Sequence, residues 1–469
     1  MSAKRNGGHM ESFLEEKPEE FNPFFRQLLA SIGPILIIIS NGIVCGYSAI
    51  LLPQLDSPTS PIQINKNEQS WIASMAPLPM ALGCSLVGWE MDRFGRKISL
   101  ILNSVVLILG WIIIYFSTSV VYLLIGRAIT GFCIGGTSPV ASCYMAEVTS
   151  PKYRGLFLSC FGSGIAFGLF LPHLFGTFWS WNTTSLLVTI CPIICIILMP
   201  FIPESHVWYL NKNDIVNAKK AFHWFRGSQS EEELEAILDT QSKCIKRSFR
   251  DSYKDYLKPT FYKPLMILNL LFMTVQFSGN NAVIFYSVSI MQETVKSLDK
   301  YAAMLIVDVI RVIISLIASG FIQKYKVRPL IMISGFGSAL SLFILSICIH
   351  AANIYPENIV IVSLPLFALL MYIVFVSFGL TSLPWALCGE LFPAETKGIG
   401  GAVGACVNFL SFFVVVKTSL DMFEHLGSIW TFATYGSFSL IGTTIAFFVL
   451  PETKGRTLND IEKYFNSNT

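Results

Sequence analysis

The residues best suited to bind a small polar ligand lie together inside one long apolar segment. Between positions 275 and 286, polar side chains interrupt a run of Val, Phe, Ala and Ile; they are Gln276, Ser278, Asn280, Asn281 and Tyr286. Because hydrocarbon penalises an unpaired polar group by several kcal/mol, such groups face protein or water rather than lipid. In a continuous helix, Gln276 and Asn280 lie one turn apart, as do Ser278 and Asn281. Amides carry donors and acceptors and suit a ligand rich in hydroxyl groups, although they also join neighbouring helices in membranes.

A cation within an apolar segment is the second candidate. Arg311 lies in the run from Ala302 to Ile322, and an ionisable residue at membrane depth is costly and indicates function. Asp308 precedes it by three residues, so the two side chains can pair on one helix face. Two interpretations stay open: a pair that neutralises itself inside the bundle, or an arginine that contacts a polar or anionic substrate.

The composition is that of a polytopic membrane protein. Hydrophobic residues make up 53% of the chain and charged residues only 13%, against about 25% charge in soluble domains. The net charge of +3 and the lack of a basic tract give no indication of a nucleic-acid partner. The 11 cysteines show no metal-ligand spacing, so we expect neither a disulfide framework nor a metal or other cofactor. No nucleophile–base pair is visible, so we do not expect an enzyme.

Twelve apolar runs are long enough to cross a bilayer, which needs about 20 residues. They predict an all-α membrane protein with 12 transmembrane helices in two groups of six. The predicted domains are an N-terminal tail (1–27), a six-helix half (28–202), a helical linker (203–263), a second half (264–450) and a C-terminal tail (451–469). The runs are Leu28–Leu52, Trp71–Gly88, Ile98–Phe116, Val121–Cys143, Leu156–Phe178, Leu186–Ile202, Leu265–Met291, Ala302–Ile322, Leu330–Ile349, Ile359–Leu387, Ile399–Met422 and Ile429–Leu450.

The distribution of Lys and Arg predicts the orientation. With a cytoplasmic N-terminus, 27 of the 33 basic residues fall on the cytoplasmic side, three fall in outer loops and three fall within spans. Cytoplasmic loops carry such an excess, so both termini and the linker are expected inside. In the linker, Asp214–Phe225 alternates apolar and charged residues at helical period, and Ser230 with Glu233 forms a capping box that would open a second helix.

The two halves repeat each other in their charged motifs. Glu147 is followed seven residues later by Arg154, and Glu390 is followed at the same spacing by Lys397. Parallel six-helix halves around a midplane site are a common construction of secondary transporters. Charges at the inner helix ends can pair when that side is closed and separate when it opens, which biases a two-state equilibrium. The predicted network comprises Arg93, Arg96, Glu147, Arg154, Glu204, Glu390, Lys397 and Glu452.

Together these motifs resemble the sugar porter family of the major facilitator superfamily over nearly the whole chain. Ser70-Trp71-Ile72-Ala73-Ser74 and Val416-Lys417-Thr418 look most like the insect facilitated trehalose transporter subgroup. The family motifs are Asp92-Arg93-x-Gly95-Arg96-Lys97, Gly126-Arg127, Glu147 with Arg154-Gly155, Pro203-Glu204-Ser205, Gln276-x-Ser278-Gly279-x-Asn281-Ala282, Pro384-Trp385, Gly389-Glu390-Leu391-Phe392-Pro393 and Pro451-Glu452-Thr453-Lys454-Gly455-Arg456-Thr457.

The resemblance implies alternating access, with a hexose or disaccharide held between the halves of a plasma-membrane protein that functions as a monomer. Gln276 and Asn281 match the family's sugar-contacting amides, and Trp385 matches a tryptophan that lines the cavity. Asn280, Tyr286 and Arg311 complete the predicted substrate site. Several glucose contacts of the family are absent, because their positions hold Val275, Gly162, Ser377, Leu410 and Phe413.

The resemblance also bears on energy coupling. Proton-coupled members carry an Asp directly after Gly-Tyr in the first helix, whereas Gly46-Tyr47 is followed here by Ser48. A serine does not titrate, so we expect facilitated diffusion rather than proton symport. A sugar sensor that does not transport and a carrier of another polar solute are the alternatives. Asn182-Thr183-Thr184 is an acceptor pattern for N-glycosylation in a short outer loop.

Overall fold

The computed structural model describes residues 22–227, 255–294, 298–393 and 396–454, together with the short pieces 233–234, 237–238 and 464–465. In this part of the chain all regular structure is helical. The helices before the linker, which we call the N-terminal half, are α1 (Pro23–Leu55), α2 (Lys66–Ser74), α3 (Pro77–Phe94), α4 (Arg96–Tyr115), α5 (Val120–Val148), α6 (Pro151–Phe178), α7 (Trp181–Leu187), α8 (Ile190–Leu198) and the short η1 (Met199–Phe201).

The linker contributes α9 (His206–Asn211) and α10 (Ile215–Arg226). The sequence predicted α10, whose N-terminus is capped by the Asp214 side chain, whereas the second predicted helix, from Ser230, lies largely outside the described residues. The C-terminal half holds η3 (Asp255–Leu257), α13 (Pro259–Phe277), α14 (Asn280–Phe285), α15 (Ser287–Thr294), α16 (Lys300–Lys324), α17 (Val327–Ile354), α18 (Ile359–Phe375), the π-helical η4 (Val376–Leu380), α19 (Leu383–Glu390) and α20 (Lys397–Val449).

Eleven helical stretches among the described residues are long and apolar enough to cross a membrane. The longest, α20, has 53 residues and contains Gly427 at φ +73°, where the helical backbone is interrupted. The predicted runs Ile399–Met422 and Ile429–Leu450 lie on either side of this glycine. Divided at Gly427, α20 supplies two spans, and the prediction of an all-α membrane protein with 12 spans is confirmed.

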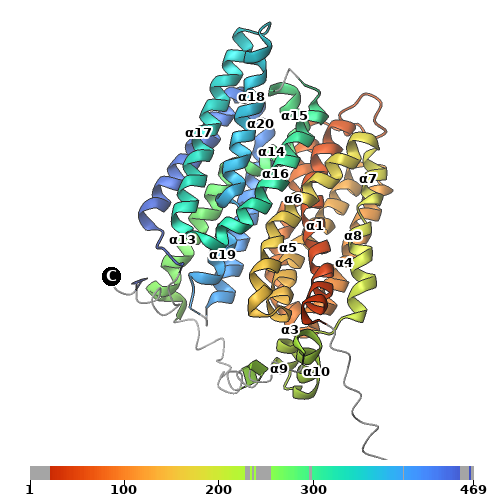
Figure 1. The fold of residues 1–469 in the computed structure, drawn as a ribbon. Coiled ribbons are helices and arrows are strands. Elements are labelled where there is room, and N and C mark those ends of the chain that lie inside the picture. The colour runs from red at the N-terminus through yellow and green to blue at the C-terminus, as the bar shows by residue number, and fades with distance from the viewer. Residues whose placement is uncertain are drawn as a thin grey trace, which may run out of the picture.

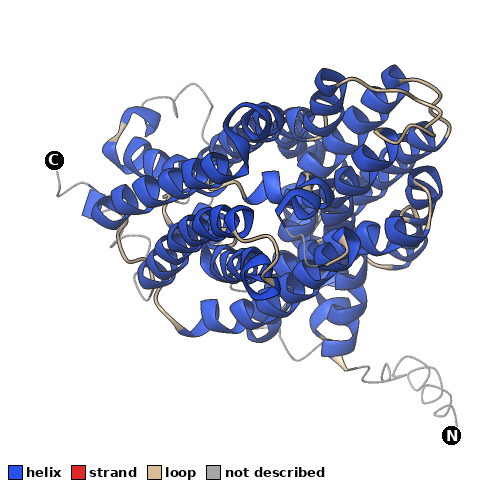
Figure 2. Cartoon of the chain, turned by 90° about the horizontal axis from the view of Figure 1, so that it is seen from above, coloured by secondary structure: helices blue, strands red, loops and turns tan. Residues whose placement is uncertain are grey.

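The two halves stand side by side as two helical bundles (Figure 1). Helices α9 and α10 lie below the N-terminal half, at the end where the cytoplasmic motifs were predicted. The view from above shows the helices of both bundles roughly end-on (Figure 2). Helix α6 of the first half meets α16 of the second half, and α2 meets α20.

Small residues let α1 and α6 approach until their backbones touch. A Cβ on Gly42 would lie 2.1 Å from the carbonyl oxygen of Ile165, and one on Gly168 would lie 2.0 Å from that of Ile39. Real carbon–oxygen contacts are never this short, so any side chain at these positions pushes the helices apart. Small residues at close helix crossings are typical of membrane proteins, where dispersion contacts rather than hydrophobic exclusion hold helices together.

We expect Gly42→Ala to destabilise the N-terminal half, because the added methyl group displaces backbone rather than a flexible side chain. Overpacking of this kind costs about 1–3 kcal/mol. The measurement is the apparent melting temperature of the purified protein in detergent. Gly320→Ala is the matched control, because nothing lies within 4 Å of a Cβ there and alanine favours a helix over glycine. Equal melting temperatures for Gly42→Ala and the parent protein would contradict the close contact.

Candidate functional site

The predicted ligand segment is not one continuous helix. Helix α13 ends at Phe277, Gly279 adopts φ +80°, and α14 begins at Asn280. A Cβ at Gly279 would lie 2.4 Å from the ring of Tyr435, so both backbone and packing require glycine. The assumed one-turn spacing of Gln276 and Asn280 is therefore wrong. The break leaves Gln276 at the end of one helix and Asn280 and Asn281 at the start of the next, a geometry that transporters use to expose backbone and polar groups to a site.

Three amides form a chain of hydrogen bonds at this break. The Asn281 Nδ2 donates to Gln276 Oε1 at 2.6 Å, and Gln276 Nε2 donates to Asn408 Oδ1 of α20 at 2.8 Å. Gln276 and Asn408 are each 4% exposed, whereas Asn281 is partly exposed. The polar groups are thus satisfied within the protein in this conformation. Because each bond joins two amides, a sugar hydroxyl can take the place of either partner without leaving a buried group unpaired.

Arg311 and Asp308 have different partners. Arg311 Nη1 donates to Asn280 Oδ1 at 3.1 Å, which places the guanidinium beside the helix break. Asp308 instead bonds His173 of α6, with 2.5 Å between the His173 Nδ1 and the Asp308 Oδ2. The structure therefore does not show the Asp308–Arg311 pair that was one of the two interpretations. Asp308 still attracts Arg311 electrostatically.

Tyr286 and Trp385 occupy different environments. The Tyr286 hydroxyl donates to the Val416 carbonyl at 2.9 Å and the residue is 2% exposed, so it joins the C-terminal end of α14 to α20. Trp385, in α19, is 39% exposed and packs edge-on against Phe272 with 4.8 Å between ring centroids. An indole that keeps one face free can cover the C–H face of a sugar ring.

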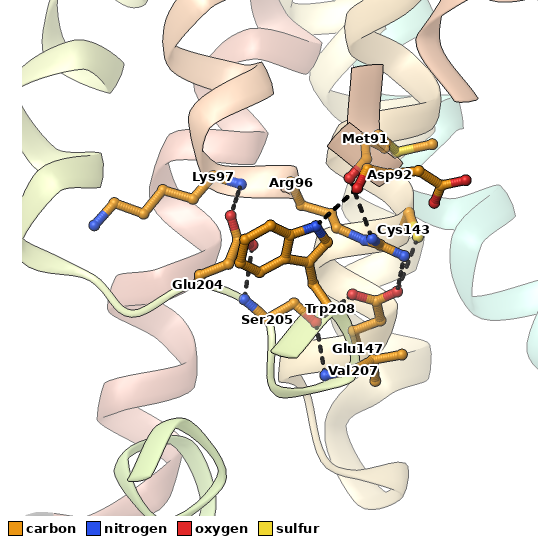
Figure 3. Close-up of polar contacts among 10 residues, drawn as sticks. All are labelled: Met91, Asp92, Arg96, Lys97, Cys143, Glu147, Glu204, Ser205, Val207 and Trp208. Atoms are coloured by element: carbon orange, nitrogen blue, oxygen red, sulfur yellow. Dashed lines mark hydrogen bonds and ion pairs between the residues drawn. The ribbon is translucent and has the colours of Figure 1, made fainter. Parts of the chain in front are cut away.

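In the N-terminal half, Arg96, Glu147 and Glu204 of the predicted charge network belong to one connected cluster (Figure 3). Arg96 Nη2 contacts Glu147 Oε1 at 2.9 Å, and the other Glu147 oxygen accepts a hydrogen bond from the Ser205 hydroxyl. Glu204 accepts backbone N–H bonds from Ser205 at 2.7 Å and from Lys97, at the start of α4, at 2.9 Å. Burial raises the pKa of the Glu204 carboxyl, and these backbone N–H groups oppose that shift.

The C-terminal half repeats two contacts of this arrangement, the glutamate at a helix start and the hydroxyl on the second glutamate, whereas its described residues show no ion pair equivalent to Arg96–Glu147. Glu452 accepts from the backbone N–H groups of Val327 and Arg328, at the start of α17, at 3.1 and 3.3 Å. The Thr453 hydroxyl donates to Glu390 Oε2 at 2.6 Å, as Ser205 does to Glu147. A carboxylate at a helix N-terminus satisfies orphan N–H groups and complements the helix dipole. The duplicated motifs therefore have a duplicated structural role within each half.

The other members of the predicted network have no such bond. Arg93 and Lys397 are exposed, and Arg154 is half-buried with its Nε lacking a hydrogen-bond partner. Four ion pairs occur in the described part of the chain, and the two that join the halves are Lys66–Glu424 and His173–Asp308. Exchange of charged partners between the halves at the cytoplasmic face stays a prediction.

Helix α2 makes several polar and aromatic contacts with α20 of the other half. The Ser70 hydroxyl donates to the Lys417 carbonyl at 2.8 Å, and the Lys417 Nζ lies 4.3 Å from the ring centroid of Trp71 and 3.3 Å from Asn67 Oδ1. Phe413 packs near the same indole at 6.2 Å. Ser70, Trp71 and Lys417 belong to the motifs that resemble the trehalose transporter subgroup, and these contacts hold α2 against α20 at the end predicted to face outside.

A buried arginine faces the position where Ser48 replaces the titratable residue of proton-coupled relatives. Arg127 is fully buried, donates to the Val44 carbonyl at 2.9 Å and contacts the Ser48 hydroxyl at 2.5 Å. The Arg127 Cζ atom lies 6.0 Å from the centroid of the Tyr47 ring, within reach of a cation–π interaction. The hydrogen-bond partners of the Arg127 guanidinium are therefore neutral groups.

Sequence reasoning missed two residues of this region. Asn408 is a lone amide in the predicted span Ile399–Met422, and His173 is a lone ionisable residue in Leu156–Phe178. Both carried a signal, because polar groups at membrane depth need partners. The partners could not be read from the sequence, since each bond joins segments more than one hundred residues apart.

The glycosylation pattern at Asn182 lies in α7 rather than in a loop. Asn182 is partly buried, and the hydroxyl-bearing Thr184 of the pattern is fully buried. Occupancy of this acceptor stays a prediction.

A histidine under the N-terminal cluster makes stability depend on pH. Burial lowers the pKa of His206 to about 4, and Arg226 and Arg154 act in the same direction. The ring packs edge-on against Phe222 at 5.2 Å, and Nδ1 has no hydrogen-bond partner. The folded protein therefore keeps this imidazole neutral where an unfolded chain, with a pKa of about 6.5, would protonate it.

We expect the folded protein to lose stability as the pH falls from 7 to 5, because the unfolded state binds a proton at His206 and the folded state does not. The readout is the apparent melting temperature in detergent. His206→Gln should reduce the difference between pH 7 and pH 5, since about 1 kcal/mol corresponds to roughly 2–4 °C in a protein of this size class or larger. His223→Gln, on α10, is the control. An unchanged difference in His206→Gln would refute this assignment.

Comparison with known proteins bears on the whole chain. The family model described as "Sugar (and other) transporter" matches residues 27–465. Facilitated trehalose transporters Tret1 from Apis mellifera ligustica and Aedes aegypti are each 30% identical, over 94% of this chain and over 88% and 56% of their own lengths. The inward-open xylose transporter XylE from E. coli shares the fold, with a TM-score of 0.75 and 20% identity over 94% of this chain and 99% of that one.

The family match therefore covers both halves, the linker and the duplicated charged motifs at once. It accords with the 12 spans and with the Pro-Glu-Ser and Pro-Glu-Thr repeats described above. The chain belongs to the sugar transporter family, a family of membrane carriers rather than enzymes, and it has the major facilitator fold.

Proposed function

We propose that this carrier moves trehalose or a hexose by facilitated diffusion, with the sugar bound between the halves beside the break between α13 and α14. The observation that carries the proposal is the amide chain Asn281–Gln276–Asn408. It joins the broken helix to α20 and offers donors and acceptors in alternation, as a polyhydroxylated ligand requires. The trehalose transporters among the relatives support trehalose as the first candidate.

The remaining residues of the proposed site surround this chain. Asn280 and Arg311 supply a second polar pair on the other side of Gly279, and Trp385 supplies an aromatic face. Tyr286 positions the segment through its bond to Val416. Because Arg311 is held by a neutral amide, its charge favours a substrate with many oxygen acceptors.

The surroundings of Arg127 support uniport. A proton-coupled site needs a group that gains and loses a proton, and Ser48, which contacts Arg127, does not titrate near neutral pH. The buried cation keeps neutral partners throughout. Transport through this arrangement needs no ion gradient.

The contacts between the halves support alternating access with the predicted orientation. Helices α2 and α20 are joined at the end expected to face outside, while each cytoplasmic cluster closes within its own half. In this proposal the structure is a state closed on the outer side and both termini lie in the cytoplasm. One chain in the plasma membrane then suffices for transport, since it contains both six-helix halves.

Counterflow in proteoliposomes tests the proposed function. We expect preloaded unlabelled trehalose or glucose to drive uptake of labelled trehalose, and a proton ionophore to leave uptake unchanged. A panel of pentoses, polyols and organic anions would identify another solute. No exchange of any sugar would contradict sugar transport and favour a sensor, and a strong loss of accumulation with ionophore would contradict uniport.

Replacing Gln276, the central residue of the amide chain Asn281–Gln276–Asn408, should impair transport more than it impairs folding. Gln276→Leu leaves Asn281 and Asn408 without their partner, and an unsatisfied buried polar group costs about 1–3 kcal/mol. We expect counterflow efficiency to fall roughly 10- to 100-fold. Thr444→Ala, an exposed position in the last span, is the matched control. Unchanged transport by Gln276→Leu, at equal protein amount, would remove Gln276 from the site.

A further inference from the structure

A buried titratable pair joins the two halves away from the amide chain. His173 lies on α6 and Asp308 on α16, and they are 1% and 4% exposed. The His173 Nδ1 lies 2.5 Å from the Asp308 Oδ2, and its Nε2 lies 2.9 Å from the carbonyl oxygen of Gly46 on α1. The imidazole therefore bridges a helix of its own half and a helix of the other half.

These two contacts fix the number of protons that the pair holds. The Gly46 carbonyl can only accept, so Nε2 must carry a hydrogen. Nδ1 then contacts the carboxyl group in one of two ways: as an N–H that donates to a carboxylate, or as a lone pair that accepts from a protonated carboxyl. Both descriptions contain one proton more than a neutral imidazole beside a carboxylate. Without that proton, a nitrogen lone pair would face a carboxylate oxygen, or Nε2 would face the carbonyl.

The neighbouring charges do not replace this proton. On α16, Arg311 interacts electrostatically with Asp308 while its Nη1 is bonded to Asn280. On α1 the titratable side chains near this level are Cys45 and Tyr47, and the Tyr47 hydroxyl donates to the Trp181 carbonyl. Arg127 of α5 is directed at Val44 and Ser48. No second acid occurs among these described groups, so the extra proton belongs to the His173–Asp308 pair.

We propose that His173 and Asp308 form a proton-binding site whose occupancy stabilises the outer-closed state of the carrier. When α6 and α16 come together, the pair takes one proton from water on the outer side and shares it between Nδ1 and Oδ2. When the halves separate on that side, the hydrogen bond breaks and the proton returns to the same water. The proton does not cross the membrane, so this site modulates the uniport proposed above, on which its role in transport rests, without driving it.

The sign of the pH effect follows from the proton count. A state that binds one more proton than its alternative gains population as the pH falls and loses population as the pH rises, by at most tenfold per pH unit. The outer-closed state should therefore dominate in acid and yield to the outward-open state in alkali.

Thiol labelling from outside measures this equilibrium directly. Ser70, 2% exposed and bonded to the Lys417 carbonyl, marks the joined surface between α2 and α20. In Ser70→Cys, reaction with a membrane-impermeant maleimide reports separation of the halves. Thr59→Cys, in an exposed outer segment, corrects for the pH dependence of the thiol reaction, and the parent protein corrects for native cysteines. We expect the ratio of the two labelling rates to rise at least about fivefold from external pH 5.5 to 8.5.

Substitution of the acid should remove this dependence and keep the contact. In Asp308→Asn, the amide N–H donates to the Nδ1 lone pair while Nε2 still donates to Gly46, so no titratable proton is needed and the ratio should stay low at every pH. If that variant fails to fold, His173→Gln retains Asp308 beside Arg311 and should also give a flat profile. His350→Gln, at an exposed position of α17, should keep the profile of the parent protein.

A flat profile in Ser70→Cys with the His173–Asp308 pair intact, or an undiminished one in both pair variants, would overturn the proposal. The labelling needs no substrate, so its result is independent of the sugar. A rising ratio together with absent counterflow would refute the proposed function and leave the proton site standing. Normal counterflow with a flat ratio would refute the proton site and leave the proposed function standing.

Discussion

A polar atom at bilayer depth must find its partner inside the protein, and this constraint organises the structure from the amide chain at the Gly279 break to the contacts between the halves. Water is absent from the hydrocarbon region, so an unpaired amide or charge there costs several kcal/mol. The chain nevertheless places Gln276, Asn408 and Arg311 in its spans, and each is paired across helices. Such pairs fix which helices meet. They also supply the groups that a hydrophilic substrate can recruit, because a partner that one protein group provides can equally be a sugar hydroxyl.

The same requirement explains the duplicated motifs at the cytoplasmic ends. A helix begins with N–H groups that lack acceptors. In both halves a glutamate after the sixth span, Glu204 or Glu452, supplies the acceptor for the start of the third span. The following hydroxyl, Ser205 or Thr453, then binds the acid at the end of the fourth span. These bonds join the ends of the third, fourth and sixth spans within each half. Motion can then concentrate at the surface between the halves.

Sequence periodicity and charge were sufficient to predict those properties that depend on local pattern. The span count, the linker helix α10 and the pairing of repeated motifs follow from apolar runs, caps and spacing. Long-range partners do not, because the bonds of Asn408 and His173 depend on how distant helices are superposed. The break at Gly279 was also missed, although glycine among amides is a signal. Whether a glycine continues or ends a helix depends here on the Tyr435 ring that packs against it, and that contact is tertiary.

Two polar clusters at membrane depth have different roles in the proposals above. The amide chain lies within the C-terminal half, beside the break at Gly279, and is proposed to exchange partners with the sugar. The His173–Asp308 pair joins the two halves, contacts α1 and is proposed to respond to proton activity and to the separation of the halves. A ligand shifts a conformational equilibrium only by its differential affinity for the two states. Since the proposed sugar and proton sites use different groups, each ligand can change the balance of states without competing for the other's site.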